Sequence, residues 1–151
     1  MSNPAAPAIL YAEDDPDDRL LAEMAHRESG AVNPFVLVAD GEEALEYLRR
    51  TGRHADRTGA PQPGVILLDL NMPGIDGRET LRIIKADPFL RRIPVVILTT
   101  STAEADIAAS YDAGANSYLV KPSDFGSLVQ LFDHLSRYWF EIGSLAKEVR
   151  P

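Results

Sequence analysis

Short apolar segments that each end in polar or charged residues constrain the fold of this chain more than any other feature. The clearest runs from Val65 to Leu68 and is followed directly by Asp69. An apolar run of this length with β-branched residues is typical of a buried strand in a parallel sheet. Parallel strands end at one common edge, where open α/β sheets hold their sites. Three more runs end in this way: 9–12 before Glu13, Asp14 and Asp15, 95–98 before Thr99, Thr100 and Ser101, and 117–120 before Lys121 and Pro122.

The predicted strands alternate with segments of helical periodicity. A further strand is expected at 35–39, which makes five. Regular alternation of strands and helices favours a doubly wound α/β fold, with a five-stranded parallel sheet between two layers of helices. Helices are predicted after Asp15, after Asp40, at 78–86, at 102–113 with Gly114 closing the end, and from about Asp124 to beyond Trp139.

The first of these helices has the clearest start signal. Asp15 is a good N-cap, and Pro16 fits the first helical position. Leu20, Leu21, Met24 and Ala25 are expected to form its buried face. The three histidines, His26, His54 and His134, are expected at the surface, since their spacing fits no shared ligand.

Charge and composition exclude several classes of function. The formal net charge of −8 argues against binding to nucleic acid or to an anionic membrane, because phosphate affinity depends on Lys and Arg. The chain has no cysteine, so disulfides and thiolate chemistry are excluded. It shows no signal peptide and no apolar run near the ~18 residues of a membrane span. A cytoplasmic protein is therefore expected.

The 151 residues fit a single domain. Residues 1–7 are expected to form a disordered tail, 8–142 the domain itself, and 143–151 a C-terminal tail or an extension of the last helix. The polar stretch 51–64 contains Gly and Pro without periodicity, and a connection of this length is either functional or a spacer.

The residues at the strand ends predict a site for a metal ion and a phosphoryl group. Three crowded carboxylates, Glu13, Asp14 and Asp69, repel one another unless a cation neutralises them. Oxygen ligands favour Mg²⁺, which usually keeps waters and shares a phosphate. A carboxylate can also act as a nucleophile and form an acyl phosphate. Lys121 would then supply positive charge, and Thr99 would donate a hydrogen bond to a phosphoryl oxygen.

These residues together resemble the receiver domains of bacterial two-component response regulators, from about residue 9 to 138. The resemblance rests on the Glu13 and Asp14 pair, Asp69 within Asp-Leu-Asn-Met-Pro-Gly, Thr99, and Lys121 before Pro122. It implies a flavodoxin-like (CheY-like) fold with strand order 2-1-3-4-5 and phosphorylation of Asp69 by a histidine kinase with Mg²⁺. It also implies that Asp14, Asp69 and the main-chain carbonyl of Asn71 bind the metal directly, with Glu13 acting through water.

The same resemblance implies how such a protein would work. Thr99 and Tyr118 would form the switch that relays phosphorylation, and the chain would be a single-domain regulator rather than an enzyme with a separate substrate. The long loop and the aromatic last helix are similar to regulators that partner phytochrome-type histidine kinases. A homodimer is expected, with Tyr138 and Trp139 as candidate contacts. Thr100 departs from the family, which usually has a smaller residue there, and could narrow access to Asp69.

Other functions remain open at this point. A constitutive receiver scaffold or dimer would not need phosphorylation, and a phosphorelay intermediate would pass its phosphoryl group to another histidine protein. An aspartyl-nucleophile phosphatase is disfavoured, because such enzymes typically place a second aspartate where this chain has Asn71.

Overall fold

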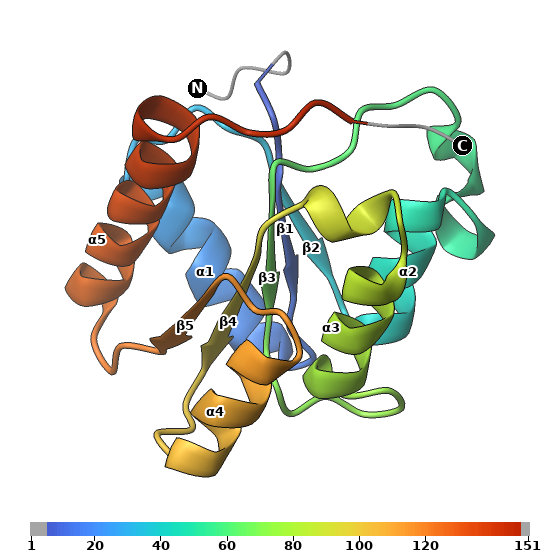
Figure 1. Cartoon of the computed structure of the whole chain (residues 1–151). Helices are drawn as coiled ribbons and strands as arrows, with labels where there is room; N and C mark the ends of the chain where they lie inside the picture. The colour runs from blue at the N-terminus through green and yellow to red at the C-terminus, as the bar shows by residue number, and fades with distance from the viewer. Residues whose placement is uncertain (1–5, 149–151) are drawn as a thin grey trace.

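A five-stranded parallel sheet forms the middle layer of this computed structural model, which describes residues 6–148 (Figure 1). The strand order is β2-β1-β3-β4-β5. Both the parallel sheet and its order confirm the predicted doubly wound fold. The strands are β1 (Ile9–Ala12), β2 (Phe35–Val38), β3 (Val65–Leu68), β4 (Val95–Thr99) and β5 (Ser117–Val120).

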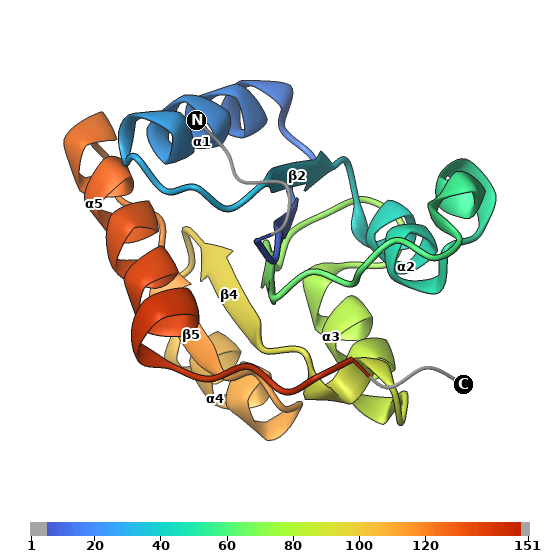
Figure 2. The ribbon, with the colours of Figure 1, turned by 90° about the horizontal axis from the view of Figure 1, so that it is seen from above.

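Helices cover both faces of this sheet (Figure 2). On one face, α1 (Pro16–Glu28) and α5 (Phe125–Ser136) pack over Tyr11, Leu67 and other buried strand residues. On the other face lie α2 (Gly41–Arg49), α3 (Gly77–Ala86) and α4 (Glu104–Asp112). Because the central strands are buried on both faces, their sequences read as continuous apolar runs.

Local capping signals explain where these helices begin. Asp15 accepts hydrogen bonds from the amides of Asp17 and Asp18, as the sequence predicted for α1. Asp40 accepts from the amide of Glu43, whose carboxylate in turn accepts from the amide of Ala39. This arrangement is a variant of the capping box, in which the second amide belongs to the residue before the N-cap. Asp124 caps α5 in a similar way through the amide of Ser127.

The predicted buried face of α1 is wrong for three of its four residues and right only for Ala25. Leu20, Leu21 and Met24 are 58%, 46% and 45% exposed, whereas Ala22, Ala25 and His26 face the core. The helix thus has two stripes at helical spacing: one of large apolar residues, which is exposed, and one with two alanines, which faces the core. The small alanines let the helix approach the sheet closely. The side-chain pattern of α1 alone does not distinguish the stripe that packs inward from one that remains on the surface.

The prediction of a surface position is also wrong for His26, which is only 7% exposed. Its ring stacks on Phe35 at 4.5 Å between centroids and meets Phe132 edge-on at 6.1 Å. An aromatic ring of this size fills the corner between α1, β2 and α5. Burial lowers the pKa of His26, so its neutral form is favoured. His54 is partly buried against Glu43, and His134 is exposed.

The last helix continues past α5 through a π-helical turn, η3 (Arg137–Ile142), before the chain leaves the helix at Gly143. Residues 143–148 then cross the amino edge of the sheet (the upper side of Figure 1). Near the other terminus, the carbonyl of Pro7 accepts a hydrogen bond from Asn33 at 2.8 Å. Residues 1–5 and 149–151, parts of the two predicted tails, lie outside the described residues.

The long connection after α2 folds back against that helix. It contains a 3-10 segment, η1 (Gly52–Arg57), in which the Arg57 guanidinium lies 3.4 Å from the centroid of the Tyr47 ring. Arg53 donates a hydrogen bond to Glu46 at 2.6 Å. Within the described part of the chain, no helix has the length and apolarity needed to cross a membrane.

Candidate phosphoacceptor and metal site

Strand register brings the predicted site residues to one edge of the sheet. Ala12 pairs with Leu68, so the residues that follow them, Glu13 and Asp69, emerge side by side from β1 and β3. Thr99 pairs with Val120, so Lys121 emerges beside Thr99 from β5. The loops that leave this carboxyl edge lie on the lower side of Figure 1.

The three predicted acidic residues converge. One carboxylate oxygen from each of Glu13, Asp14 and Asp69 lies within 4.8 Å of the other two. Glu13 is 1% exposed and Asp69 7%, whereas Asp14 is open to solvent. The site therefore has buried acidic groups and one exposed acidic group at its mouth.

Lys121 is the cation of this cluster. Its ammonium lies 2.7 Å from Asp69 Oδ2 and 3.4 Å from Asp18 Oδ2, and it also donates a hydrogen bond to Glu13 Oε1. Its side chain is 14% exposed, so these interactions are screened only weakly by water. Lys121 therefore forms an ion pair with Asp69 in this structure.

The cluster perturbs the pKa values of its members. Burial raises the pKa of Glu13 to about 7, because its effect exceeds the opposing effect of the hydrogen bonds from Lys121 and the Asp15 amide. Burial also acts to raise the pKa of Asp69, but hydrogen bonds from Lys121 and the Asn71 amide outweigh it and lower that pKa. Burial tends to lower the pKa of Lys121, and its acidic neighbours raise it overall. Lys121 and the Asn71 amide thus favour the ionised form of Asp69.

Asp69 is held in a defined orientation. Its Oδ1 accepts from the Thr99 hydroxyl at 3.2 Å and from the Asn71 amide at 3.1 Å, while Oδ2 faces Lys121. The start of α3 packs directly behind it, because a Cβ on Gly77 would lie 2.0 Å from the Asp69 carbonyl oxygen. Only glycine allows this approach. The acceptor is thereby fixed relative to α3.

The predicted switch residues lie on neighbouring strands, and their hydroxyls bond to different partners. Thr99 is fully buried against Asp69, whereas the Tyr118 hydroxyl donates to the carbonyl of Ser101 at 2.9 Å. Thr100 is exposed at the same edge. The switching roles of Thr99 and Tyr118 stay predictions.

Two residues that the sequence reasoning missed support the acidic pair. Arg19 donates to the carbonyl of Glu13 at 2.7 Å and to that of Asp14 at 2.9 Å. The Tyr11 hydroxyl lies 3.4 Å from Glu13 Oε1, beneath the site. Arg19 lies one helical turn beyond the Asp15 cap, and that spacing is the signal that could have found it.

The donor set fits a hard divalent cation. Lys121 contacts Glu13, Asp18 and Asp69, and Asp14 lies beside this group, so the carboxyl groups outnumber the ammonium group among them. Oxygen donors of this kind suit Mg²⁺ or Mn²⁺. The Asn71 amide is engaged with Asp69, and metal binding by the Asn71 carbonyl stays a prediction.

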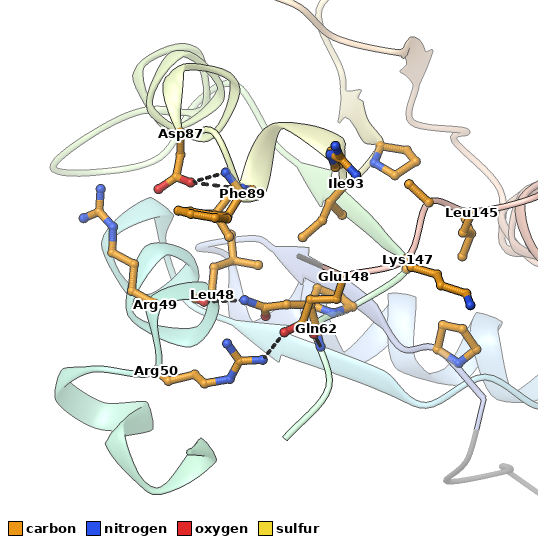
Figure 3. A pocket seen from close by; sticks show the side chains of 17 residues that line it. Leu48, Arg49, Arg50, Gln62, Asp87, Phe89, Ile93, Leu145, Lys147 and Glu148 are labelled. Carbon is orange, nitrogen blue, oxygen red and sulfur yellow. Dashed lines mark hydrogen bonds and ion pairs between the residues drawn. The ribbon is translucent and has the colours of Figure 1, made fainter. Parts of the chain in front are cut away.

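A separate pocket lies at the opposite edge of the sheet and contains none of these residues (Figure 3). Its volume is about 320 Å³, and it lies near the residues that precede β1, β3 and β4. The 143–148 segment forms one wall, where Glu148 pairs with Arg50 at 3.1 Å. The predicted site and this pocket are at different ends of the strands.

Sequence comparison agrees with the geometry of the carboxyl edge. Residues 9–133 match the response regulator receiver domain. The chain belongs to that family. Response regulator Rcp1 of Synechocystis is 38% identical over 144 residues, which cover 95% of each chain.

Solved receiver structures extend the similarity. The phosphorylated cyanobacterial phytochrome response regulator RcpA is 41% identical, with a TM-score of 0.85 over 95% of this chain and all of RcpA. The response regulator RPA3017, in red light signalling of R. palustris, is 36% identical, with a TM-score of 0.87 over 93% of this chain and 99% of its own. The Mn²⁺-bound form of Rcp1 has a TM-score of 0.81 at 37% identity, over 93% of this chain and 99% of its own. This receiver is thus homologous to phytochrome response regulators.

Proposed function

We propose that this receiver accepts a phosphoryl group from a histidine kinase on Asp69 and, once phosphorylated, changes its interactions with other proteins. The observation that carries the proposal is the convergence of two further carboxylates, Glu13 and Asp14, and of Lys121 on Asp69. A structural aspartate would not need two more acidic groups beside it, because their mutual repulsion has a cost.

The surroundings of Asp69 suit nucleophilic attack on phosphorus. A carboxylate oxygen would form the new P–O bond while the P–N bond to the kinase histidine breaks, and the leaving imidazole keeps the electron pair. Lys121 would hold a phosphoryl oxygen by charge, and Thr99 would donate a hydrogen bond to another. The chain would thus assist its own phosphorylation and, with water as the attacking group, its dephosphorylation, without acting on a separate substrate.

Mg²⁺ is the cation we assign to the acidic cluster, with Asp14, Asp69 and the Asn71 carbonyl as direct ligands and Glu13 acting through water. The bound ion would neutralise the carboxylates and the incoming phosphoryl oxygens. The oxygen-only donor set and the Mn²⁺-bound structure of the homologue Rcp1 support this assignment.

A phytochrome-type histidine kinase is the partner that the homologues favour, since RcpA is described as a phytochrome response regulator. The kinase histidine has to reach the carboxyl edge of the sheet. Leu20, Leu21 and Met24 offer an exposed apolar surface on α1, the helix that begins just after Asp14. A contact with the kinase would account for the exposure of these three apolar side chains, which have the spacing of a buried helix face.

We also propose that the chain forms a homodimer through its last helix. Tyr138 is 56% exposed and contacts Trp139 edge-on at 5.0 Å, whereas Trp139 itself packs partly into the core. The exposed ring next to β5, an edge strand of the sheet, fits a contact between copies. We further propose a single-domain organisation, with the domain at 8–142. We also propose that the protein is cytoplasmic and does not bind nucleic acid.

Intact-protein mass spectrometry after incubation with acetyl phosphate and Mg²⁺ tests the proposed function. We expect the gain of one phosphate, dependent on Mg²⁺ and lost in Asp69→Asn. Light scattering in parallel reads the oligomeric state. No gain from either acetyl phosphate or a phosphorylated phytochrome-type kinase would contradict the proposal and favour a constitutive scaffold.

A further inference from the structure

The pocket at the amino edge of the sheet has the size and the apolar lining of a small-molecule site (Figure 3). Leu48 from α2 and the side chains of Phe89, Leu90 and Ile93, which precede β4, line it. Its volume of about 320 Å³ falls within the range of roughly 300 to 1,000 Å³ that is typical of ligand pockets. The space therefore fits one small molecule with an apolar ring.

Basic side chains outnumber acidic ones around this pocket, although the whole chain has a formal net charge of −8. Glu148 pairs with Arg50, and Asp87 accepts hydrogen bonds from two main-chain amides at 2.8 and 3.0 Å. Arg49 and Arg92 are exposed and form no ion pair with any of the residues 6–148. The lining also includes Lys147. The rim of the pocket therefore attracts an anion.

The side chain of Gln62 adds a buried hydrogen-bond acceptor to the lining. Its Nε2 donates to the Leu48 carbonyl at 2.6 Å, which assigns the other end of the amide as the acceptor (Figure 3). This Oε1 is buried, and no group in the described part of the chain donates to it. A buried acceptor without a partner is unfavourable. A bound molecule with a donor would satisfy it.

We propose that this pocket binds a small aromatic carboxylate that carries a ring N–H. The N–H donates to Gln62 Oε1, the ring lies within the apolar lining, and the carboxylate faces Arg49 and Arg92 at the rim. Guanidinium groups suit this role because they pair with carboxylates through two parallel hydrogen bonds. The pocket contains none of the residues around Asp69, so the inference does not rest on the proposed phosphorylation.

Three probes separate the features of this ligand. Indoleacetate has the ring, the N–H and the carboxylate, naphthylacetate lacks the N–H, and tryptamine replaces the carboxylate by an ammonium group. Binding is followed by NMR through the amides of Gln62, Gly64, Leu90 and Ile93. We expect indoleacetate to bind with a dissociation constant of about 1 mM or below. Naphthylacetate should bind about fivefold more weakly, and tryptamine at least about tenfold more weakly.

Neighbouring arginines provide a matched pair of variants. Arg92 lines the pocket, whereas Arg91 is equally exposed and lies outside the lining. Arg92→Gln should weaken the binding of indoleacetate about three- to tenfold, because it removes a charge from the rim. Arg91→Gln should leave the affinity unchanged. Urea unfolding of each variant shows that the fold is retained.

Gln62→Met tests the buried acceptor. The variant keeps the length of the side chain but has no oxygen to receive the ring N–H. Indoleacetate should then lose its advantage of about fivefold, so that the two acids bind the folded variant with similar affinity. A retained preference for indoleacetate would overturn the role of Gln62.

Two other outcomes would overturn the proposal as a whole. One is the absence of saturable binding of indoleacetate to the wild type up to about 10 mM, a concentration above any specific affinity expected here. The other is equal weakening in Arg92→Gln and Arg91→Gln, which would mean that the rim acts only through the overall charge of the protein. Phosphoryl uptake at Asp69 is measured separately, and its result bears on the proposed function alone.

Discussion

At its carboxyl edge the sheet gathers buried charges, whereas at its amino edge apolar side chains and a peripheral ion pair cover the strand starts. Lys121 faces Glu13 and Asp69 at the first edge. Phe140, Leu145 and Pro7 surround Gly64 at the second, with the pair of Arg50 and Glu148 outside them. A buried charge has a desolvation cost that apolar packing lacks. The comparison teaches that the chain concentrates buried charges at one edge, where chemistry needs them.

The largest effect is expected from Lys121→Met at the charged edge. Two mostly buried carboxylates lose their cation, so the free energy of unfolding should fall by about 3 kcal/mol without Mg²⁺. Phosphoryl uptake should slow by about 10²-fold or more, because the charge on the phosphoryl oxygens is no longer balanced. Urea unfolding in EDTA and in Mg²⁺, together with phosphorylation rates, measures both effects.

Lys85 provides a matched control at the amino edge. It is half-buried and donates to the carbonyls of Arg91 and Ile93 at 3.0 and 2.9 Å. Lys85→Met should leave the rate of phosphoryl uptake unchanged. Equal slowing in both variants would mean that the two edges do not differ in the way proposed.

Two glycine-to-alanine variants, one at each edge of the sheet, compare the edges by adding a Cβ atom. Gly77→Ala places a Cβ 2.0 Å from the Asp69 carbonyl oxygen, which is backbone, so we expect a loss of about 3 kcal/mol in stability together with slower phosphorylation. Gly64→Ala meets side-chain atoms of Phe140, Leu145 and Pro7 at 2.6, 2.8 and 2.8 Å; because side chains give way more easily than backbone, it should cost less, about 1 to 2 kcal/mol.

Thermal unfolding and acetyl phosphate labelling distinguish these two variants. Phosphorylation should be impaired in Gly77→Ala and normal in Gly64→Ala once both are folded. Normal labelling of a folded Gly77→Ala protein would show that the α3 contact does not help to hold Asp69.

A smaller effect is expected from Glu148→Gln, which removes the charge from the outer pair of the amino edge. Arg50 and Glu148 are 16% and 25% exposed, and Glu148 also accepts from the Gln62 amide at 2.8 Å. The loss should be about 1 kcal/mol or less. It should shrink in 1 M NaCl, because salt screens such a pair. Urea unfolding at two salt concentrations measures it, with the exposed Glu42→Gln as control.

The sequence predicted the charged edge better than the packing of the helices. Glu13, Asp69 and Lys121 could be placed because each directly follows an apolar strand, and the order of parallel strands then fixes their neighbours. The buried stripe of α1 could not be chosen, since Leu20 and Met24 are as apolar as any core residue. The ion pair between Arg78 and Asp106 could not be predicted either, because it depends on how α3 and α4 sit against each other.

The last prediction concerns His26, the buried ionisable ring on the side of the sheet covered by α1 and α5. Because burial holds its pKa below the unfolded value near 6.5, the unfolded chain takes up the proton first as the pH falls. The His26 contribution to stability is therefore full above that value and is lost as the pH drops below it. The slope from one proton is at most about 1.4 kcal/mol per pH unit. His26→Phe keeps the stacking on Phe35 and should flatten the decline of unfolding free energy between pH 7 and pH 5, whereas His134→Gln, at an exposed position, should not. Identical slopes of unfolding free energy against pH in the wild type and His26→Phe would contradict this prediction. They would mean that the His26 ring is protonated as readily in the folded protein as in the unfolded chain. Burial of a neutral ring would then not distinguish this region from the charged edge.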